Sequence, residues 1–141
     1  VVKWLDTGGL VDAPHSVTAA TLLSAAAGCG QLEVVRELLE RGASVDLPCG
    51  YGVTALMEAA RNDHLSTLLV LLQHSAKPDL QDIWGCTALM AAAEEGAQQC
   101  VRALLRAKAN IELLDEDGVT ALQWAEHEGR TATAELIRQH A

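Results

Sequence analysis

The sequence predicts an all-α solenoid, in which antiparallel helix pairs stack in one row and are joined by short β-hairpin loops. Thr-Ala-Leu occurs at residues 54–56, 87–89 and 120–122, a constant spacing of about 33 residues, and Thr21-Leu22-Leu23 stands one period earlier. A fixed period of this length is typical of one small unit that is copied and stacked. The apolar residues are also mostly small and aliphatic, since aromatic residues make up 3% of the chain and Phe is absent.

We expect one domain divided into repeats. Complete units span residues 16–48, 49–81 and 82–114, between a partial unit at 1–15 and a C-terminal capping unit at 115–141. Each unit of such an array packs only on its neighbours, so the array folds as one body. The stretch Leu5–Asp12 resembles Leu39–Asp46, the end of a second helix. We therefore expect the chain to be a fragment or to have a disordered start.

The second unit shows the expected elements most completely. Gly50-Tyr51-Gly52 predicts a turn, because Gly tolerates positive φ, and Thr54 is a favourable N-cap. A short helix is predicted over residues 55–61 and a longer one over 65–73, separated by Asn62-Asp63-His64. Pro78 then turns the chain outward.

The other units repeat this pattern and differ at the two ends of the array. In the third unit Gly85 marks the turn, Thr87 the cap and Gly96 the end of the first helix. The first unit has Thr21 at the cap position but Ala19 in place of the loop glycine, so its loop is expected to be irregular. In the last unit, polar or small residues replace larger apolar ones at Arg138 and Ala134, as a terminal repeat requires.

Composition and charge restrict the classes of partner. The net charge is −9, with ten basic and nineteen acidic residues. Binding to a nucleic-acid backbone needs clustered Lys and Arg, so we expect no nucleic-acid partner. We also expect no membrane partner, because no apolar run is long enough to span a bilayer and no secretory signal is found. Four cysteines without a Cys-x-x-Cys arrangement favour reduced thiols in an intracellular protein, cytoplasmic or nuclear.

No catalytic, metal or cofactor site is predicted, and the protein is expected not to be an enzyme. The triplet Glu126-His127-Glu128 lacks a second His one helical turn away, and the pair Glu94-Glu95 lies at a polar helix end. Cys49 and Cys86 fall in neighbouring loops, so a redox bridge is an alternative to two free thiols. Cys100 takes a buried second-helix position as a small hydrophobe.

These residues resemble the ankyrin repeat, whose unit has a β-turn, two antiparallel helices and a T-P-L-H-x-A signature. The pattern G-x-T-A-L-x-x-A-A recurs from Gly52 and Gly85 and, with Glu126 in its last place, from Gly118. The family's Pro and His are replaced throughout, the His by Ser24, Met57, Met90 and Gln123. Only Thr120 and Gln123 keep a reciprocal capping pair. Asp63, Ser75 and Lys108 replace the usual Gly after a helix, each destabilising by up to about 1 kcal/mol if φ is positive.

The resemblance implies a protein-interaction module that holds its partner with loop tips and the exposed face of the first helices. The expected partner-binding residues are Tyr51, Val53, Met57, Arg61 and Asn62 in the second unit, Ile83, Trp84, Met90, Glu94 and Glu95 in the third, and Glu116, Asp117, His127 and Glu128 in the fourth. The acidic residues among them predict a bound segment that carries Lys or Arg beside an aromatic or aliphatic side chain.

The aromatic residues take different expected roles. Tyr51 and Trp84 fall on equivalent loop tips, where exposed rings would anchor a partner; the alternative is that both rings lie flat on the neighbouring loop and only support the stack. Trp124 is expected to pack against the third unit, and Trp4 to cap the exposed end.

The favoured function is a monomeric, non-catalytic interaction module. Three alternatives stay open. The first is a structural array that self-associates through Val1, Val2 and Trp4. The second is the regulatory domain of a larger enzyme or channel, and the third is an engineered repeat protein. The irregular first loop argues against a consensus design.

Overall fold

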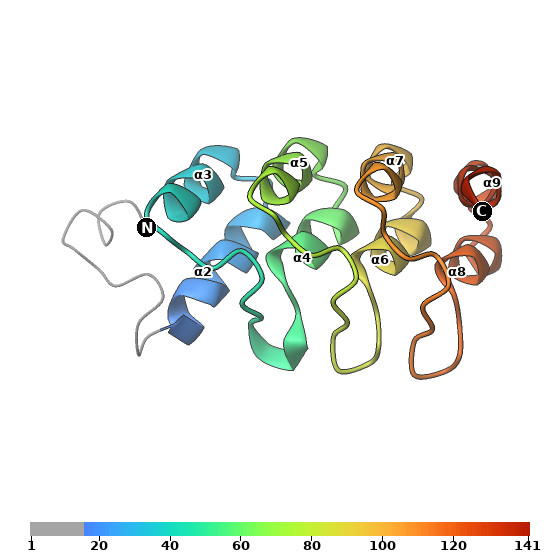
Figure 1. Cartoon of the computed structure of the whole chain (residues 1–141), viewed down its shortest axis with the longest axis horizontal. Coiled ribbons are helices and arrows are strands. Elements are labelled where there is room, and N and C mark those ends of the chain that lie inside the picture. Colours follow the sequence, from blue (N-terminus) through green and yellow to red (C-terminus); the bar gives the residue numbers. More distant parts are fainter. Residues whose placement is uncertain (1–15) are drawn as a thin grey trace.

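The computed structural model describes residues 16–141, which form a single row of helix pairs (Figure 1). The partial unit at residues 1–15, with Val1, Val2 and Trp4, lies outside the described residues. In the described part the helices are α2 (Ser16–Gly28), α3 (Leu32–Glu40), α4 (Ala55–Arg61), α5 (Leu65–Gln73), α6 (Ala88–Glu95), α7 (Gln98–Arg106), α8 (Ala121–His127) and α9 (Thr131–His140), with one 3-10 turn, η1 (Gly50–Gly52). The all-α solenoid is confirmed.

The helices form two layers. The first helices of the units, α2, α4, α6 and α8, contact one another in sequence, and the second helices, α3, α5, α7 and α9, do the same beside them (Figure 1). The loops project together from one edge of this double layer. Within residues 16–141 these loops contain no strand, and the tip of each is a tight turn closed by a backbone hydrogen bond such as that from Asp82 N to Cys86 O, at 3.0 Å.

The core between the layers is built from alanine and leucine. On the first helices, Ala59, Ala60 and Ala92 are fully buried, and the second helices contribute Leu68 and Leu104. Because a methyl group leaves little distance between helix axes, alanine allows the first helices to pack closely, while the longer leucines fill the space beneath. The layers are therefore thin, and each unit depends on its neighbours for burial.

Three threonines begin the first helices, as their spacing predicts. The Oγ1 atoms of Thr54, Thr87 and Thr120 accept from backbone N–H groups three residues later, over 3.2–3.3 Å. The reciprocal pair of Thr120 and Gln123 is confirmed, with Thr120 N donating to Gln123 Oε1 at 2.9 Å. A second pair was not predicted: Met57 Sδ lies 3.4 Å from Thr54 N and takes the place of the glutamine oxygen.

The helix ends also follow the sequence. Gly96 ends α6 in the left-handed region, with φ 71°. The three residues predicted to stand in place of a glycine, Asp63, Ser75 and Lys108, have φ values of 57°, 68° and 66°. Each non-glycine side chain is therefore held in a conformation that disfavours it by about 1 kcal/mol.

The first unit departs from the prediction. Its first helix begins at Ser16, so that Thr21 lies inside α2 instead of capping it. The physical reason is in the sequence: Ala19 and Ala20 stand where the other units have a loop, and alanine favours continuation of the helix. An N-terminal extension of α2 by more than one helical turn thus replaces the irregular loop that the sequence predicted.

The last unit exposes a polar outer face, as expected. Arg138 forms ion pairs with Glu126 at 2.7 Å and with Glu135 at 3.3 Å, while Ala134 and Ile137 face inward and are buried. Among residues 16–141, no helix combines the length and apolarity needed to cross a membrane.

Candidate functional site

An aspartate at the base holds each of the last two loops in shape. Asp82 Oδ1 accepts from the backbone N–H groups two and four residues further on, those of Trp84 and Cys86, both over 2.9 Å. Asp115 Oδ1 accepts from the equivalent groups of its own loop at the same distance. Such carboxylates satisfy backbone donors that a turn leaves without partners. The spacing D-x-x-G-x-T, common to both loops, is the sequence signal for this arrangement, and these aspartates were not among the predicted site residues.

Asp115 also fixes the indole of the fourth unit. Its Oδ2 accepts from Trp124 Nε1 at 2.9 Å. Partial burial acts to raise the pKa of Asp115, but hydrogen bonds from the Val119 backbone, the Trp124 indole and the Asp117 backbone outweigh it, and the pKa lies below its ordinary value. The carboxylate therefore stays ionised and holds the loop to the first helix near neutral pH.

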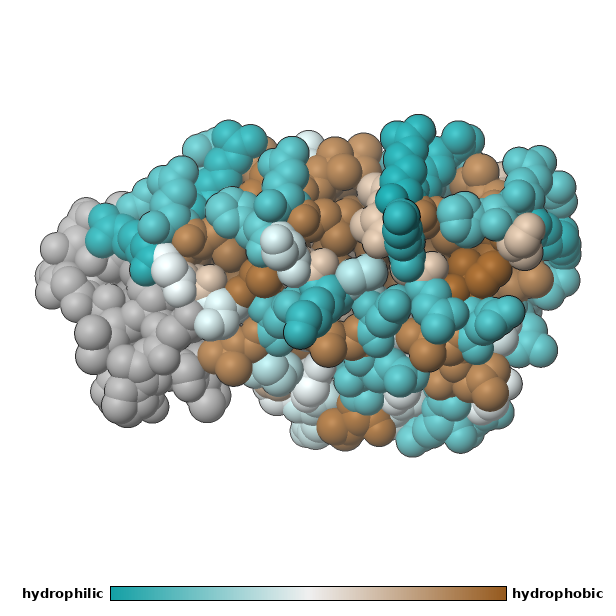
Figure 2. Space-filling view, viewed as in Figure 1, coloured by the Kyte–Doolittle hydropathy of each residue, from teal (hydrophilic) through white to brown (hydrophobic). Residues whose placement is uncertain are grey.

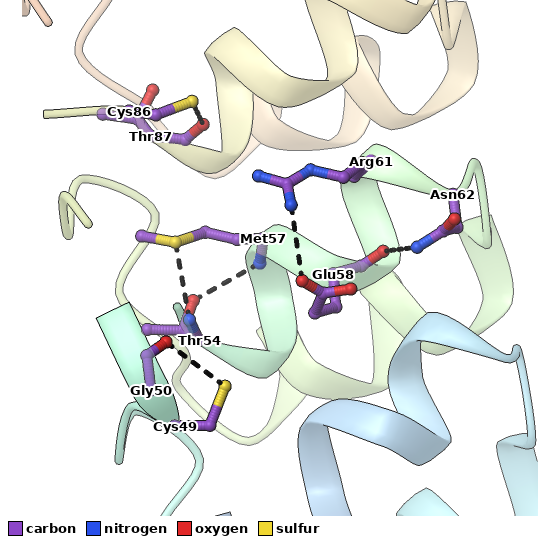
Figure 3. Close-up of polar contacts among 9 residues, drawn as sticks. All are labelled: Cys49, Gly50, Thr54, Met57, Glu58, Arg61, Asn62, Cys86 and Thr87. Atoms are coloured by element: carbon purple, nitrogen blue, oxygen red, sulfur yellow. Dashed lines mark hydrogen bonds and ion pairs between the residues drawn. The ribbon is translucent and has the colours of Figure 1, made fainter. Parts of the chain in front are cut away.

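The loop of the second unit, which precedes α4, is built differently, because Cys49 stands where the loops of the third and fourth units have aspartate. Among the described residues, its thiol hydrogen-bonds the adjacent Gly50 carbonyl alone, over 3.8 Å (Figure 3). Tyr51 adopts φ 67° and ψ 18°, a left-handed conformation that is uncommon for a bulky residue. The equivalent Trp84 and Asp117 do not share this positive φ. Strain of this kind often marks a functional site.

Backbone bonds join each loop to the next. Ile83 N donates to Tyr51 O at 3.0 Å, and Glu116 N donates to Trp84 O at 2.9 Å. Gln81 Nε2 adds a cross-link, donating to the carbonyl oxygens of Gly85 at 2.8 Å and Leu114 at 2.9 Å. The tip residues are thus presented on a continuous hydrogen-bonded support.

Three apolar side chains project from this support, and we call them the tip patch: Tyr51, Ile83 and Trp84. Their exposed fractions are 68%, 59% and 46%. The rings of Tyr51 and Trp84 lie 5.5 Å apart between centroids, tilted by 34°. Apolar surface is visible at the free ends of the loops among hydrophilic neighbours (Figure 2). The two rings contact each other and keep much of their surface open to solvent, and the anchoring role of these tips stays a prediction.

The end of α4 carries the predicted Arg61 and Asn62, both exposed. Arg61 Nη1 lies 3.6 Å from Glu58 Oε1, and Asn62 Nδ2 donates to the Glu58 carbonyl at 2.9 Å (Figure 3). Both side chains therefore have partners on α4.

The surface becomes acidic toward the C-terminal end. We define the acidic surface as Glu94, Glu95, Glu116, Asp117 and Glu128. Glu94 is half-buried and the other four are exposed. The predicted His127 is exposed beside them, with Nδ1 3.2 Å from Glu128 Oε1. Glu94, Glu95 and Glu128 lie at the ends of α6 and α8, which contact each other, and Glu116 and Asp117 lie in the loop that leads into α8.

A hollow of about 390 Å³ opens beside the fourth loop. It is lined by Asp117, Gly118, Val119, Gln123, Trp124 and His127. The Trp124 and His127 rings meet edge to face, 6.3 Å between centroids. An aromatic wall with a carboxylate at its rim suits a long aliphatic side chain that ends in a positive charge.

The comparison with protein families identifies the architecture. The family model described as ankyrin repeats (3 copies) matches residues 1–82 and again 75–141, and these matches together span the chain. The chain belongs to the ankyrin repeat family. Ankyrin repeats are generally protein–protein interaction modules and are typically non-catalytic. A comparison with curated proteins finds none that matches.

Three predicted binding residues are buried inside the ankyrin repeats. Val53, Met57 and Met90 are 7%, 1% and 2% exposed. Met57 and Met90 occupy the position of the signature His, where their backbone N–H groups bond the capping threonines and their side chains fill the core. Their side chains therefore belong to the core beneath the loops and do not form part of the exposed surface on which a partner was predicted to bind.

The cysteines of the ankyrin repeats that the structure describes are free thiols. Cys49 and Cys86 each hydrogen-bond a neighbouring backbone carbonyl and do not form a bridge (Figure 3). Burial, together with the nearby Asp82 carboxylate, raises the pKa of Cys86 to about 11. Burial raises the pKa of Cys100 to about 12, assisted by Asp63, whose Oδ1 lies 3.6 Å from Sγ. Both thiols are protonated and weakly nucleophilic near neutral pH.

Proposed function

We propose that this ankyrin repeat array is a monomeric, non-catalytic module that binds a protein partner through the tip patch and the acidic surface. The observation that carries the proposal is the exposure of Tyr51 and Trp84 on a support of backbone hydrogen bonds. Rings held in place before binding lose little conformational entropy when a partner covers them. Aromatic residues of this kind are enriched among those that dominate binding energy.

The chemistry of the surface favours a segment with two features. Its aromatic or aliphatic side chain contacts the tip patch, and a Lys or Arg extends along the acidic surface toward the hollow beside Trp124. The complementary charge increases the association rate at low salt, whereas the ring contacts set the lifetime of the complex. We place this activity inside the cell, in the cytoplasm or nucleus, where the free thiols remain reduced.

The test compares two alanine variants in affinity capture followed by kinetic measurement. Tyr51→Ala/Trp84→Ala removes the exposed rings, and Leu69→Ala removes an apolar side chain of α5 that is 41% exposed and away from the loops. A partner captured by the native protein is expected to bind the double variant at least about tenfold more weakly and the control with unchanged affinity. Equal capture by native protein and double variant would refute a role for the tip patch.

A second pair of variants tests the acidic surface. Glu95→Lys/Glu128→Lys reverses two exposed carboxylates on it, and Glu33→Lys/Glu40→Lys makes the same charge change on α3. The first pair is expected to slow association by about an order of magnitude at low salt and to flatten its salt dependence. If the α3 variant slows association equally, the effect is that of net charge alone, and the acidic surface takes no direct part.

A further inference from the structure

The second-helix layer carries a depression between α7 and α9 that belongs to neither the tip patch nor the acidic surface. It encloses about 280 Å³ and is lined by Arg102, Leu105, Arg106, Leu136, Gln139 and His140. The two leucines, buried and half-buried, provide an apolar floor, and the arginines and His140 are exposed. Figure 1 places α7 and α9 in the layer farther from the free ends of the loops.

The charge of this depression is not compensated within the described residues. Arg36, Arg41, Arg61 and Arg138 each pair with a glutamate. Arg102 and Arg106 have no such partner between residues 16 and 141. Glu135 of the facing helix is occupied by Arg138 and Gln139.

The placement of the arginines is unfavourable for the isolated helix. They stand four residues apart on α7, and like charges at this spacing repel by about 0.2–0.5 kcal/mol. Arg106 is favoured by its position in the last helical turn, but Arg102 lies too far from that end to benefit. The chain has a net charge of −9, so two neighbouring guanidinium groups without a carboxylate partner among residues 16–141 make this part of the surface locally positive.

We propose that this depression, which we call the basic cleft, binds an acidic segment of a second protein. Two carboxylates about 6 Å apart accept from Arg102 and Arg106, and an aliphatic side chain between them covers Leu105 and Leu136. Guanidinium groups suit carboxylates because their donors form paired hydrogen bonds. A continuous polyanion is disfavoured, since the rest of a surface with this net charge repels it. The array thus has two binding surfaces of opposite sign.

The test selects peptides from a random dodecapeptide library displayed on phage. The bait is Tyr51→Ala/Trp84→Ala, so that binding to the tip patch does not contribute and the outcome is separate from that of the proposed function. Enriched sequences are expected to contain two or more Asp or Glu around a Leu, Ile or Val. Synthetic versions are expected to bind at least about tenfold more weakly when Arg102→Glu/Arg106→Glu is added to the bait.

Two controls make the result decisive. Arg36→Glu/Arg41→Glu, added to the same bait, changes the net charge equally on α3 and at its C-cap, and is expected to preserve peptide affinity. Peptides with Gln in place of Glu are expected to lose binding. Far-UV circular dichroism with thermal unfolding confirms that every bait variant is folded. Failure to enrich acidic sequences, equal binding to the α7 charge-reversal bait, or retained binding of the neutral peptides would each overturn the proposal.

Discussion

Two equivalent glycines allow the packing between neighbouring loops to be measured. Gly85 and Gly118 occupy the same place in successive loops and have nearly the same φ, 76° and 74°. A Cβ atom on Gly85 would lie 2.9 Å from both Asp115 Cα and Glu116 N of the next loop, whereas one on Gly118 would meet nothing within 4 Å. Alanine at the two sites therefore introduces the same backbone strain but only one steric overlap.

The magnitude follows from adding these terms. Alanine in the left-handed region is disfavoured by about 1–2 kcal/mol. Alanine also lowers the conformational entropy of the unfolded chain, which offsets about 0.4–1 kcal/mol of this strain. Gly118→Ala is therefore expected to destabilise the protein by about 1 kcal/mol. At Gly85 the overlap is with backbone and displaces the fourth loop, at the expense of the bond from Glu116 N to Trp84 O. Overpacking of this kind adds about 2 kcal/mol, which gives roughly 3 kcal/mol for Gly85→Ala.

Urea unfolding followed by far-UV circular dichroism measures the difference between the two variants. With a common m value, the midpoints give the two free energies directly, and coincident tryptophan fluorescence checks that unfolding is two-state. A difference of about 2 kcal/mol corresponds to about 7 °C in Tm for a chain of this length. Equal destabilisation by the two substitutions would refute the close packing of the third loop on the fourth, and with it the rigid support beneath the tip patch.

Two further predictions concern the residues at the base of the loops. Because the pKa of Asp115 is lowered in the folded state, its contribution to the free energy of unfolding is complete above the unfolded pKa and is lost as pH falls through the folded pKa. The free energy of unfolding of the native protein is therefore expected to fall below about pH 4. Asp115→Asn is expected to be less stable at pH 7 and to lose less stability as the pH is lowered. An unchanged acid limb in the variant would remove Asp115 from this role. Cys49→Asp supplies the hydrogen-bond acceptor that the loop of the second unit lacks. The substitution is expected to raise the free energy of unfolding by about 1 kcal/mol. It is also expected to move Tyr51 to negative φ, which backbone chemical shifts report. Cys49→Ala is the matched control, and a gain in that variant would show that removal of the thiol is responsible.

The sequence predicts most of this architecture because repetition reveals positions that a single copy would not. The bounds of α4 and α5 agree with the prediction, since Thr54 caps the first and Asn62-Asp63-His64 separates the two. The first unit fails the same reasoning. There the period places Thr21 at a cap, but no glycine precedes it, and local helix propensity prevails over the repeat pattern.

The candidate site is predictable only in part, for a different reason. Position in the repeat correctly indicates which tips are exposed, Tyr51 and Trp84 among them. It does not indicate in which direction the side chains that follow a tip point. Val53 and Met57 therefore enter the core although they closely follow the exposed Tyr51 in sequence. The unpaired state of Arg102 and Arg106 depends on which acidic side chains the neighbouring helix presents, and no pattern within one unit contains that information.

The residue at the base of a loop determines which side chains the tip exposes to a partner of the proposed kind. Aspartate at positions 82 and 115 bonds the N–H groups of the tips that follow and keeps φ of Trp84 and Asp117 negative. At position 49 the thiol provides no comparable acceptor, and Tyr51 turns into the left-handed region, where its ring reaches that of Trp84. The aromatic pair therefore follows from a difference between two loops, and a set of identical units would not present it. Under the proposed function, variation at the loop base would change binding specificity and leave the helical frame unchanged.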